Sequence, residues 1–202
     1  MTTFNEDQLD ALREIVNVAM GRAGDALARL LDRFIELPVP AIRFVDAPRV
    51  LDAIREMVSD HVSITAVRQA FSTVAPGECV VIFGATSFHE LAVLTGLDPA
   101  DGLAAEEELI LHVANLLVGA CVGGIADQLA QEMTYSPPSI IVRDGDVDRV
   151  LDATALPWKT ALVVEVNFRV EGRAFVAHSL VFWPETAIER VREHIDSFLA
   201  AL

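Results

Sequence analysis

Four residues near the amino terminus combine useful chemistry with helical spacing. Asp10, Glu14, Asn17 and Gly21 lie in LDALREIVNVAMG, residues 9–21, separated by four, three and four positions. At about 100° per residue, this spacing places them in a stripe about 60° wide on one helix face. A carboxylate can pair with a cation, and a carboxamide can hold water because it both donates and accepts hydrogen bonds. The apolar residues gather on a different side: Leu9, Leu12, Val16, Ala19, Ala23, Leu27 and Leu30.

Two interpretations of this stripe are open. A polar stripe is usually a solvated face, and Asp10 and Glu14 also suit the positive end of a helix dipole. Asn17 and Gly21 fit a solvated face poorly, because in a helix they cost about 0.5 and 1 kcal/mol relative to alanine. A glycine within a helix often lets another backbone approach closely. The alternative is therefore a face that binds a partner.

The stripe recurs 98 residues later. Residues 9–46 align without a gap with residues 107–144, and the matching stripe is Glu108, His112, Asn115 and Gly119. Identical pairs at this offset include Asn17/Asn115, Gly21/Gly119, Ala28/Ala126, Leu31/Leu129, Pro40/Pro138 and Asp46/Asp144. A fixed offset over 38 residues predicts a duplicated unit.

Each half predicts the same order of elements around its stripe. A long helix is followed by a short strand after proline, an irregular or helical stretch, a β-hairpin and a closing helix. We therefore expect one α/β (α+β) domain over residues 1–202, made of repeats 1–98 and 99–202. About six strands would form one sheet with pseudo-two-fold symmetry, and the two long helices would pack on it.

The composition narrows the class of protein. The formal net charge of −15 argues against nucleic-acid partners and against binding an anionic membrane. The apolar stretch 109–125 contains His112, Asn115 and three glycines, which favours a buried helix over a membrane span. The start of the chain lacks the pattern of a secretory signal. Cys79 and Cys121 lie in apolar runs, so we expect reduced core thiols and a cytoplasmic protein.

The motif resembles that of the CheC/CheX/FliY family of chemotaxis phosphatases, and its duplication looks closest to CheC. The pattern is an acidic or serine residue, three residues, Glu, two residues, Asn, twenty-two residues and Pro. The first copy is Asp10, Glu14, Asn17 and Pro40. The second copy is Glu108, His112, Asn115 and Pro138. The resemblance covers nearly the whole chain, without an additional module of the kind that FliY carries.

The resemblance implies hydrolysis of the aspartyl phosphate on a CheY-like response-regulator receiver domain in two-component signalling. Asn17 would orient the attacking water, and Glu14 would pair with the receiver's active-site lysine. Gly21 on the same stripe would permit close approach of the receiver. The resemblance implies no cofactor and no metal site in this chain, because the required Mg²⁺ belongs to the receiver.

The second copy departs from the family pattern. His112 stands in the place of Glu, and imidazole cannot replace a carboxylate as the partner of a lysine. His112 is alternatively a satisfied, partly buried histidine in an apolar helix. Asn115 keeps the water-positioning group, so residues 108–119 are a degenerate second site.

Two other functions are compatible with the sequence. The first is a non-catalytic adaptor that binds a receiver domain or the receptor deamidase CheD, and the degenerate second copy favours it. The second is a structural component of the flagellar switch, which has less support because no assembly domain is visible in the sequence.

Overall fold

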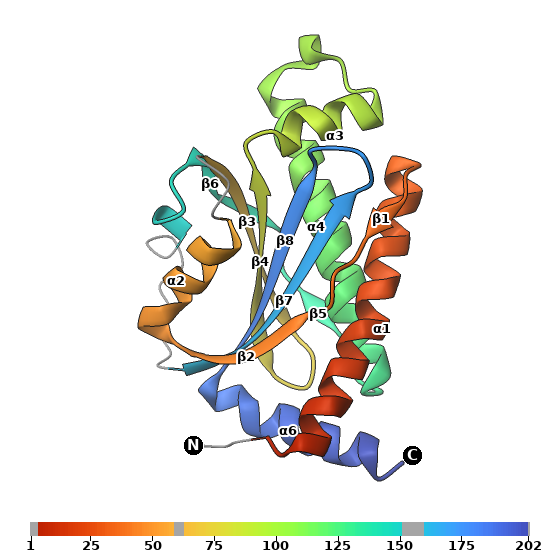
Figure 1. Ribbon diagram of the computed structural model, residues 1–202, viewed down its shortest axis with the longest axis vertical. Coiled ribbons are helices and arrows are strands. Elements are labelled where there is room, and N and C mark those ends of the chain that lie inside the picture. The colour runs from red at the N-terminus through yellow and green to blue at the C-terminus, as the bar shows by residue number, and fades with distance from the viewer. Residues whose placement is uncertain (1–3, 59–62, 151–159, 202) are drawn as a thin grey trace.

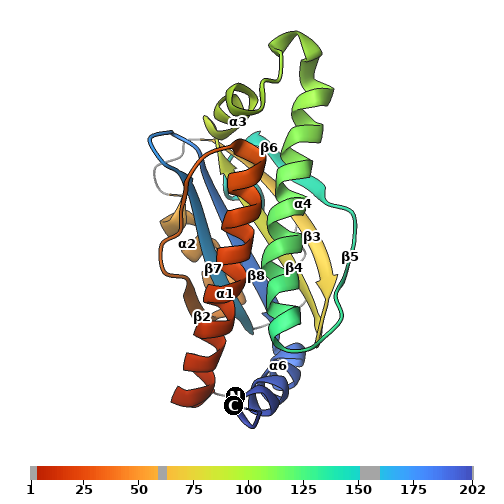
Figure 2. The same ribbon diagram turned by 90° about the vertical axis from the view of Figure 1, so that its right-hand side faces the viewer.

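The computed structural model describes residues 4–58, 63–150 and 160–201. Two long helices lie side by side on one face of an antiparallel sheet, and a shorter helix covers part of the other face (Figures 1 and 2). The long helices are α1 (Glu6–Leu31) and α4 (Gly102–Gln128), and the shorter helix is α2 (Ala47–Met57). The sheet therefore has an apolar core on both faces.

The sheet is built from two long hairpins in its centre. The hairpin strands are β3 (Ile64–Ser72), β4 (Pro76–Gly84), β7 (Thr160–Val170) and β8 (Val176–Pro184). The outer strands are β1 (Ile35–Glu36), β2 (Ala41–Asp46), β5 (Thr134–Tyr135) and β6 (Ser139–Gly145). Strand order is β1-β7-β8-β4-β3-β5, with β2 also paired to β7 and β6 to β3. The expected α/β fold with one shared sheet is confirmed.

The order of elements is similar in the two halves of the chain. After the outer strand β2 and the hairpin β3–β4, α3 (Ser87–Thr95) closes the first half. A short 3-10 helix, η1 (Pro99–Asp101), leads into α4. After β6 and the hairpin β7–β8, α6 (Glu185–Leu199) closes the second half. The duplication into residues 1–98 and 99–202 stays a prediction.

Helix α4 carries the most apolar stretch of the chain. By length and composition alone it could cross a membrane, but 56% of its most apolar window is buried within the protein. The buried side chains include Val113, Leu117, Val118, Cys121 and Val122, which share one core with α1 and the sheet. The expectation of a buried helix over 109–125 agrees with this packing.

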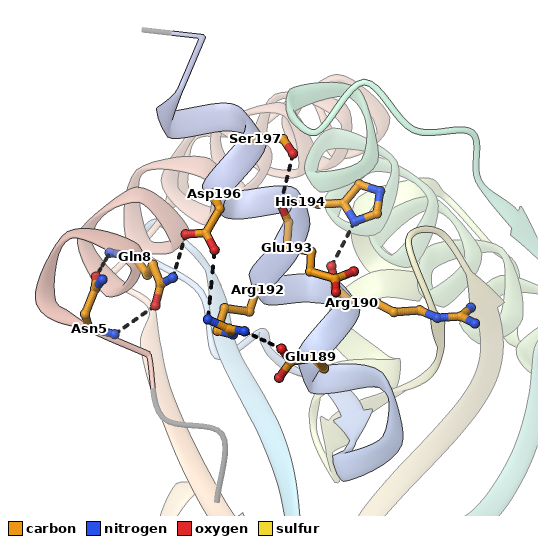
Figure 3. Close-up of polar contacts among 9 residues, drawn as sticks. All are labelled: Asn5, Gln8, Glu189, Arg190, Arg192, Glu193, His194, Asp196 and Ser197. Carbon is orange, nitrogen blue, oxygen red and sulfur yellow. Dashed lines mark hydrogen bonds and ion pairs between the residues drawn. The ribbon is translucent and has the colours of Figure 1, made fainter.

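The amino-terminal end of α1 is fixed by a capping box and by α6. Asn5 and Gln8 exchange hydrogen bonds between side chain and backbone, at 2.9 and 2.8 Å. The Gln8 amide also donates to Asp196 Oδ1 at 2.6 Å. Figure 3 shows that Asp196 and Arg192 face this end of α1 from the surface of α6. The contacts set the position of the helix turn that precedes the stripe.

Replacement of Gln8 by alanine should lower the free energy of unfolding by about 1 to 2 kcal/mol. The change removes one partner from the capping box and the donor to Asp196. Urea unfolding of the two proteins measures the difference. Glu6→Ala is the control, since Glu6 is exposed in the same turn and should cost only a few tenths of a kcal/mol. Equal losses for the two variants would contradict the assigned role of Gln8.

Both thiols lie in the apolar core. Burial raises the pKa of the Cys121 thiol to about 12 and that of Cys79 well above its usual value. At pH 8 both thiols should therefore react with a thiol reagent only after unfolding, releasing two equivalents per chain. Stability should fall as the pH rises above about 8.5, because unfolded thiols ionise there and buried ones do not. One fast-reacting thiol in the native protein would contradict this prediction.

Candidate functional site

The first stripe lies on the outer face of α1. Asp10, Glu14, Asn17 and Gly21 are all exposed, while Ile15 and other residues on the opposite side are buried under the sheet. Asp10 pairs with Arg13 at 2.6 Å. The Glu14 and Asn17 side chains make no hydrogen bond or ion pair with the described part of the chain. A carboxylate and a carboxamide one turn apart are thus available to an incoming partner.

A glycine on this stripe leaves open space. Apart from its chain neighbours and the nearby backbone of α1 itself, a Cβ atom built on Gly21 would meet no atom of the described residues within 4 Å. Glycine lowers the stability of the helix relative to alanine, and at position 21 no close packing within the described residues compensates for this loss. An intramolecular close contact does not explain the residue, which leaves the approach of a partner as the interpretation to test.

The segment after α1 runs back along this helix (Figure 1). Leu37 packs directly over Gly24, where a Cβ would lie 2.6 Å from Leu37 Cδ1. Val39 in this segment is 86% exposed, and Pro40 is buried.

The second stripe lies on α4 beside a groove of about 840 Å³. Glu108, His112, Asn115 and Pro138 all contribute to its lining. Glu108 and His112 are exposed, whereas Asn115 and Gly119 are partly buried. The interpretation of His112 as a partly buried histidine is therefore wrong: its position on the helix faces away from the core. The ring stands where the family pattern has a carboxylate.

The two asparagines differ in their hydrogen bonds. Asn115 Oδ1 accepts a hydrogen bond from Gln69 Nε2 at 2.9 Å. The same nitrogen donates to the Ser136 carbonyl oxygen at 2.8 Å. Gln69 lies on β3 and is 1% exposed. Asn17 has no such partner among the described residues. The two stripes therefore differ in the hydrogen bonding of their asparagines as well as in the exchange of Glu14 for His112.

Sequence reasoning missed Gln69, although a signal was present. Val67 and Phe71 face the helices, and alternation along a strand places the residue between them on the same face. A glutamine at an inward position of an otherwise apolar strand predicts a buried polar contact. Its partner could not be read from the sequence, since Asn115 lies 46 positions away.

No cluster that could hold a metal occurs in the described ranges. No group of three or more His, Cys, Asp or Glu side chains is suitably placed in residues 4–58, 63–150 and 160–201. Because Asp10 pairs with Arg13, the first stripe offers one carboxylate, Glu14, and one carboxamide, Asn17, to a partner. These groups can bind a cation and orient a water molecule.

Solved structures with the same fold include chemotaxis proteins, FliY and the FliM middle domain. FliY from Thermotoga maritima is 20% identical, with a TM-score of 0.69, and the match covers 98% of this chain and all of FliY's chain in that structure. A CheX–CheY–BeF3–Mg²⁺ complex from Borrelia burgdorferi matches at 12% identity and a TM-score of 0.54, covering 86% and 99%. The FliM middle domain from H. pylori matches at 11% identity and 0.58, covering 95% and 99%. No model of a known protein family matches the sequence.

These likenesses define the class of fold. It is a mixed α/β fold with a curled antiparallel sheet and two long helices on one face. The chain has the fold of the CheC/CheX/FliY family. The FliM middle domain shares this fold, so the fold alone does not assign a function to this chain.

Proposed function

We propose that this protein is a cytoplasmic phosphatase of a phosphorylated CheY-like receiver domain in chemotaxis signalling. The observation that carries the proposal is the pair Glu14 and Asn17, both exposed, one turn apart and without a partner in the described residues. A neighbour of the same fold, CheX, occurs in a solved complex with CheY, BeF3 and Mg²⁺. Both the fold and the site therefore support a receiver as the partner.

The chemistry needs little from the enzyme beyond positioning. An acyl phosphate is intrinsically labile, so a water molecule held in line with phosphorus removes much of the barrier. The Asn17 carboxamide would orient this water, because its Oδ1 atom would accept a hydrogen bond from the water O–H. Glu14 would fix the docked receiver by pairing with its lysine. Mg²⁺ held by the receiver would neutralise the phosphoryl charge, and the phosphate would leave with the receiver's aspartate restored.

The test is dephosphorylation of a CheY-like receiver loaded with acetyl phosphate in the presence of Mg²⁺. Catalytic amounts of this protein should accelerate phosphate release well above the spontaneous rate. The receiver should come from the same genome, because docking depends on its surface. Unchanged decay with a receiver that binds this protein would contradict the phosphatase proposal.

An adaptor without catalysis is the second candidate. Two observations favour it: the bonded state of Asn115 and the likeness to the FliM middle domain. An adaptor would bind the receiver, or CheD, in stoichiometric amounts and leave the acyl phosphate lifetime unchanged. Binding measured by calorimetry together with an unchanged phosphate-release rate would decide for it.

A further inference from the structure

We propose that Gln69 is a positioning residue that keeps the second site hydrolytically silent. Gln69 holds the Oδ1 atom of Asn115, the acceptor that would orient water at that site. The inference rests on the proposed phosphatase function and concerns the second site, on α4. It predicts that the His112 substitution is only one of two features that silence this site.

The orientation of both amides is fixed by a backbone group. The Ser136 carbonyl oxygen can only accept, so the atom of Gln69 that contacts it must be Nε2. The same Nε2 faces Asn115, whose contacting atom must therefore be the acceptor Oδ1. A flip of either amide would bring two acceptors or two donors together. Asn115 thus keeps its acceptor turned toward Gln69, leaving its Nδ2 donor as the group not engaged by this bond.

Strand β7, which occupies in the second hairpin the place of β3 in the first, carries no counterpart of Gln69 on its face toward the helices. The residues of β7 that face α1 and α4 are Leu162, Val164, Val166, Phe168 and Val170, all buried and apolar. None of these side chains can donate a hydrogen bond to Asn17. The Asn17 carboxamide can therefore use both its donor and its acceptor on a partner. The two sites therefore differ in two ways: Asn115 is hydrogen-bonded to Gln69 whereas Asn17 has no such partner in the described residues, and His112 stands where the first site has Glu14.

Gln69 is expected to lower the stability of the fold relative to an apolar residue at the same position. Its Oε1 atom is buried and has no hydrogen-bond partner among the described residues. An apolar side chain would fill the same space without leaving a buried acceptor unsatisfied. Two hydrogen bonds from Nε2, to Asn115 and to Ser136, offset part of this unfavourable free energy. Gln69 therefore acts on the conformation of the second stripe.

The test uses gain of function in an Asn17→Ala background, where the first site is removed. His112→Glu alone should leave phosphate release from the phosphorylated receiver at its spontaneous rate. His112→Glu combined with Gln69→Leu should raise the rate at least about fivefold, because Asn115 Oδ1 is then free. Loss of a merely structural residue would not increase a rate. Gln69→Met replaces the leucine variant if thermal melts show that the latter is unfolded.

The other outcomes overturn the inference. Equal activation by His112→Glu with and without the Gln69 change would show that the hydrogen bond does not silence the site. A folded double variant at the spontaneous rate would refute the positioning role. If the unaltered protein itself has no phosphatase activity, the proposed function fails instead. The assay of the unaltered protein therefore distinguishes failure of the Gln69 proposal from failure of the phosphatase proposal.

A spectroscopic measurement tests the geometry without any activity. In ¹⁵N-labelled unaltered protein, the Gln69 side-chain amide protons should exchange with solvent at least about tenfold more slowly than those of Asn17. Gln69 is buried and bonded, whereas Asn17 is exposed. Exchange at equal rates would overturn the proposed bond to Asn115.

Discussion

Asn17→Ala should return the decay of the receiver's acyl phosphate to its spontaneous rate. Asn17 is an exposed carboxamide on the first stripe, with no hydrogen-bond partner among the described residues. Loss of one group that positions or stabilises the reacting atoms typically lowers a rate by about a hundredfold or more. Because Asn115 is held by Gln69, the second site should not compensate. Phosphate release under steady-state conditions measures the loss.

The same assay separates orientation of water from docking. Asn17→Ala should mainly lower kcat, because the docked complex loses the group that holds the water. Glu14→Ala should mainly raise KM for the phosphorylated receiver, because it removes the partner of the receiver's lysine. Arg29→Ala is the control: this residue is exposed on α1, twelve positions beyond Asn17, and pairs with Asp25. Arg29→Ala should keep both constants within about twofold.

Two results would contradict this assignment. An Asn17→Ala protein that keeps most of its activity would show that another group orients the water. An equal fall of kcat in the Arg29→Ala control would show that the losses come from damage to α1. Circular dichroism of each variant separates the second case from a true catalytic effect, because both substitutions are on the surface.

The sequence contained enough information for the elements and for the first stripe. The period of 3.6 in residues 9–31 arises from burial of one helix face, which acts locally along the chain. The hairpin strands are recognised from β-branched and aromatic residues on both sides of a glycine-containing turn. Strands β1 and β5 have two residues each, too few for any pattern, so the sheet has eight strands where about six were expected.

Pairing between the halves could not be predicted. Strand β2 pairs with β7, and β6 pairs with β3, so each half adds its outer strand to the hairpin of the other half. Any exposed strand edge can in principle accept such a strand, and the choice depends on the whole sheet. This exchange brings Ser136, just before β6, beside Gln69 on β3. The asymmetry of the second site is therefore a consequence of tertiary pairing.

The crossing of α1 and α4 should be the most sensitive place in the core. A Cβ built on Gly124 would lie 2.8 Å from Ala19 Cα and 2.9 Å from Ala19 Cβ. Because both contacts involve atoms fixed to a helix backbone, the helices themselves must move apart. Gly124→Ala should lower the free energy of unfolding by about 2 to 3 kcal/mol. Thermal and urea unfolding measure this loss, expected at about 5 to 10 °C in Tm.

Gly119→Ala is the matched control, with the same substitution on the same helix. Outside the nearby backbone of α4, a Cβ at Gly119 would meet no described atom within 4 Å. The higher helix propensity of alanine should therefore raise stability by about 0.5 to 1 kcal/mol. Opposite signs at these two positions would show that close helix packing, and not propensity, decides the effect. Destabilisation by both variants to the same extent would contradict the proposed packing.

Gly124 also connects packing to the proposed activity. Asn17 precedes Ala19 by two residues, which places it about 160° around α1 from the face that contacts Gly124. When α1 is displaced at Ala19, the Asn17 carboxamide must move outward with the same helix turn. A displacement of about 1 Å is enough to lower a rate that depends on orientation by about a hundredfold. Gly124→Ala should therefore lose phosphatase activity at temperatures where the protein is still folded, whereas Gln8→Ala should lose it only on unfolding.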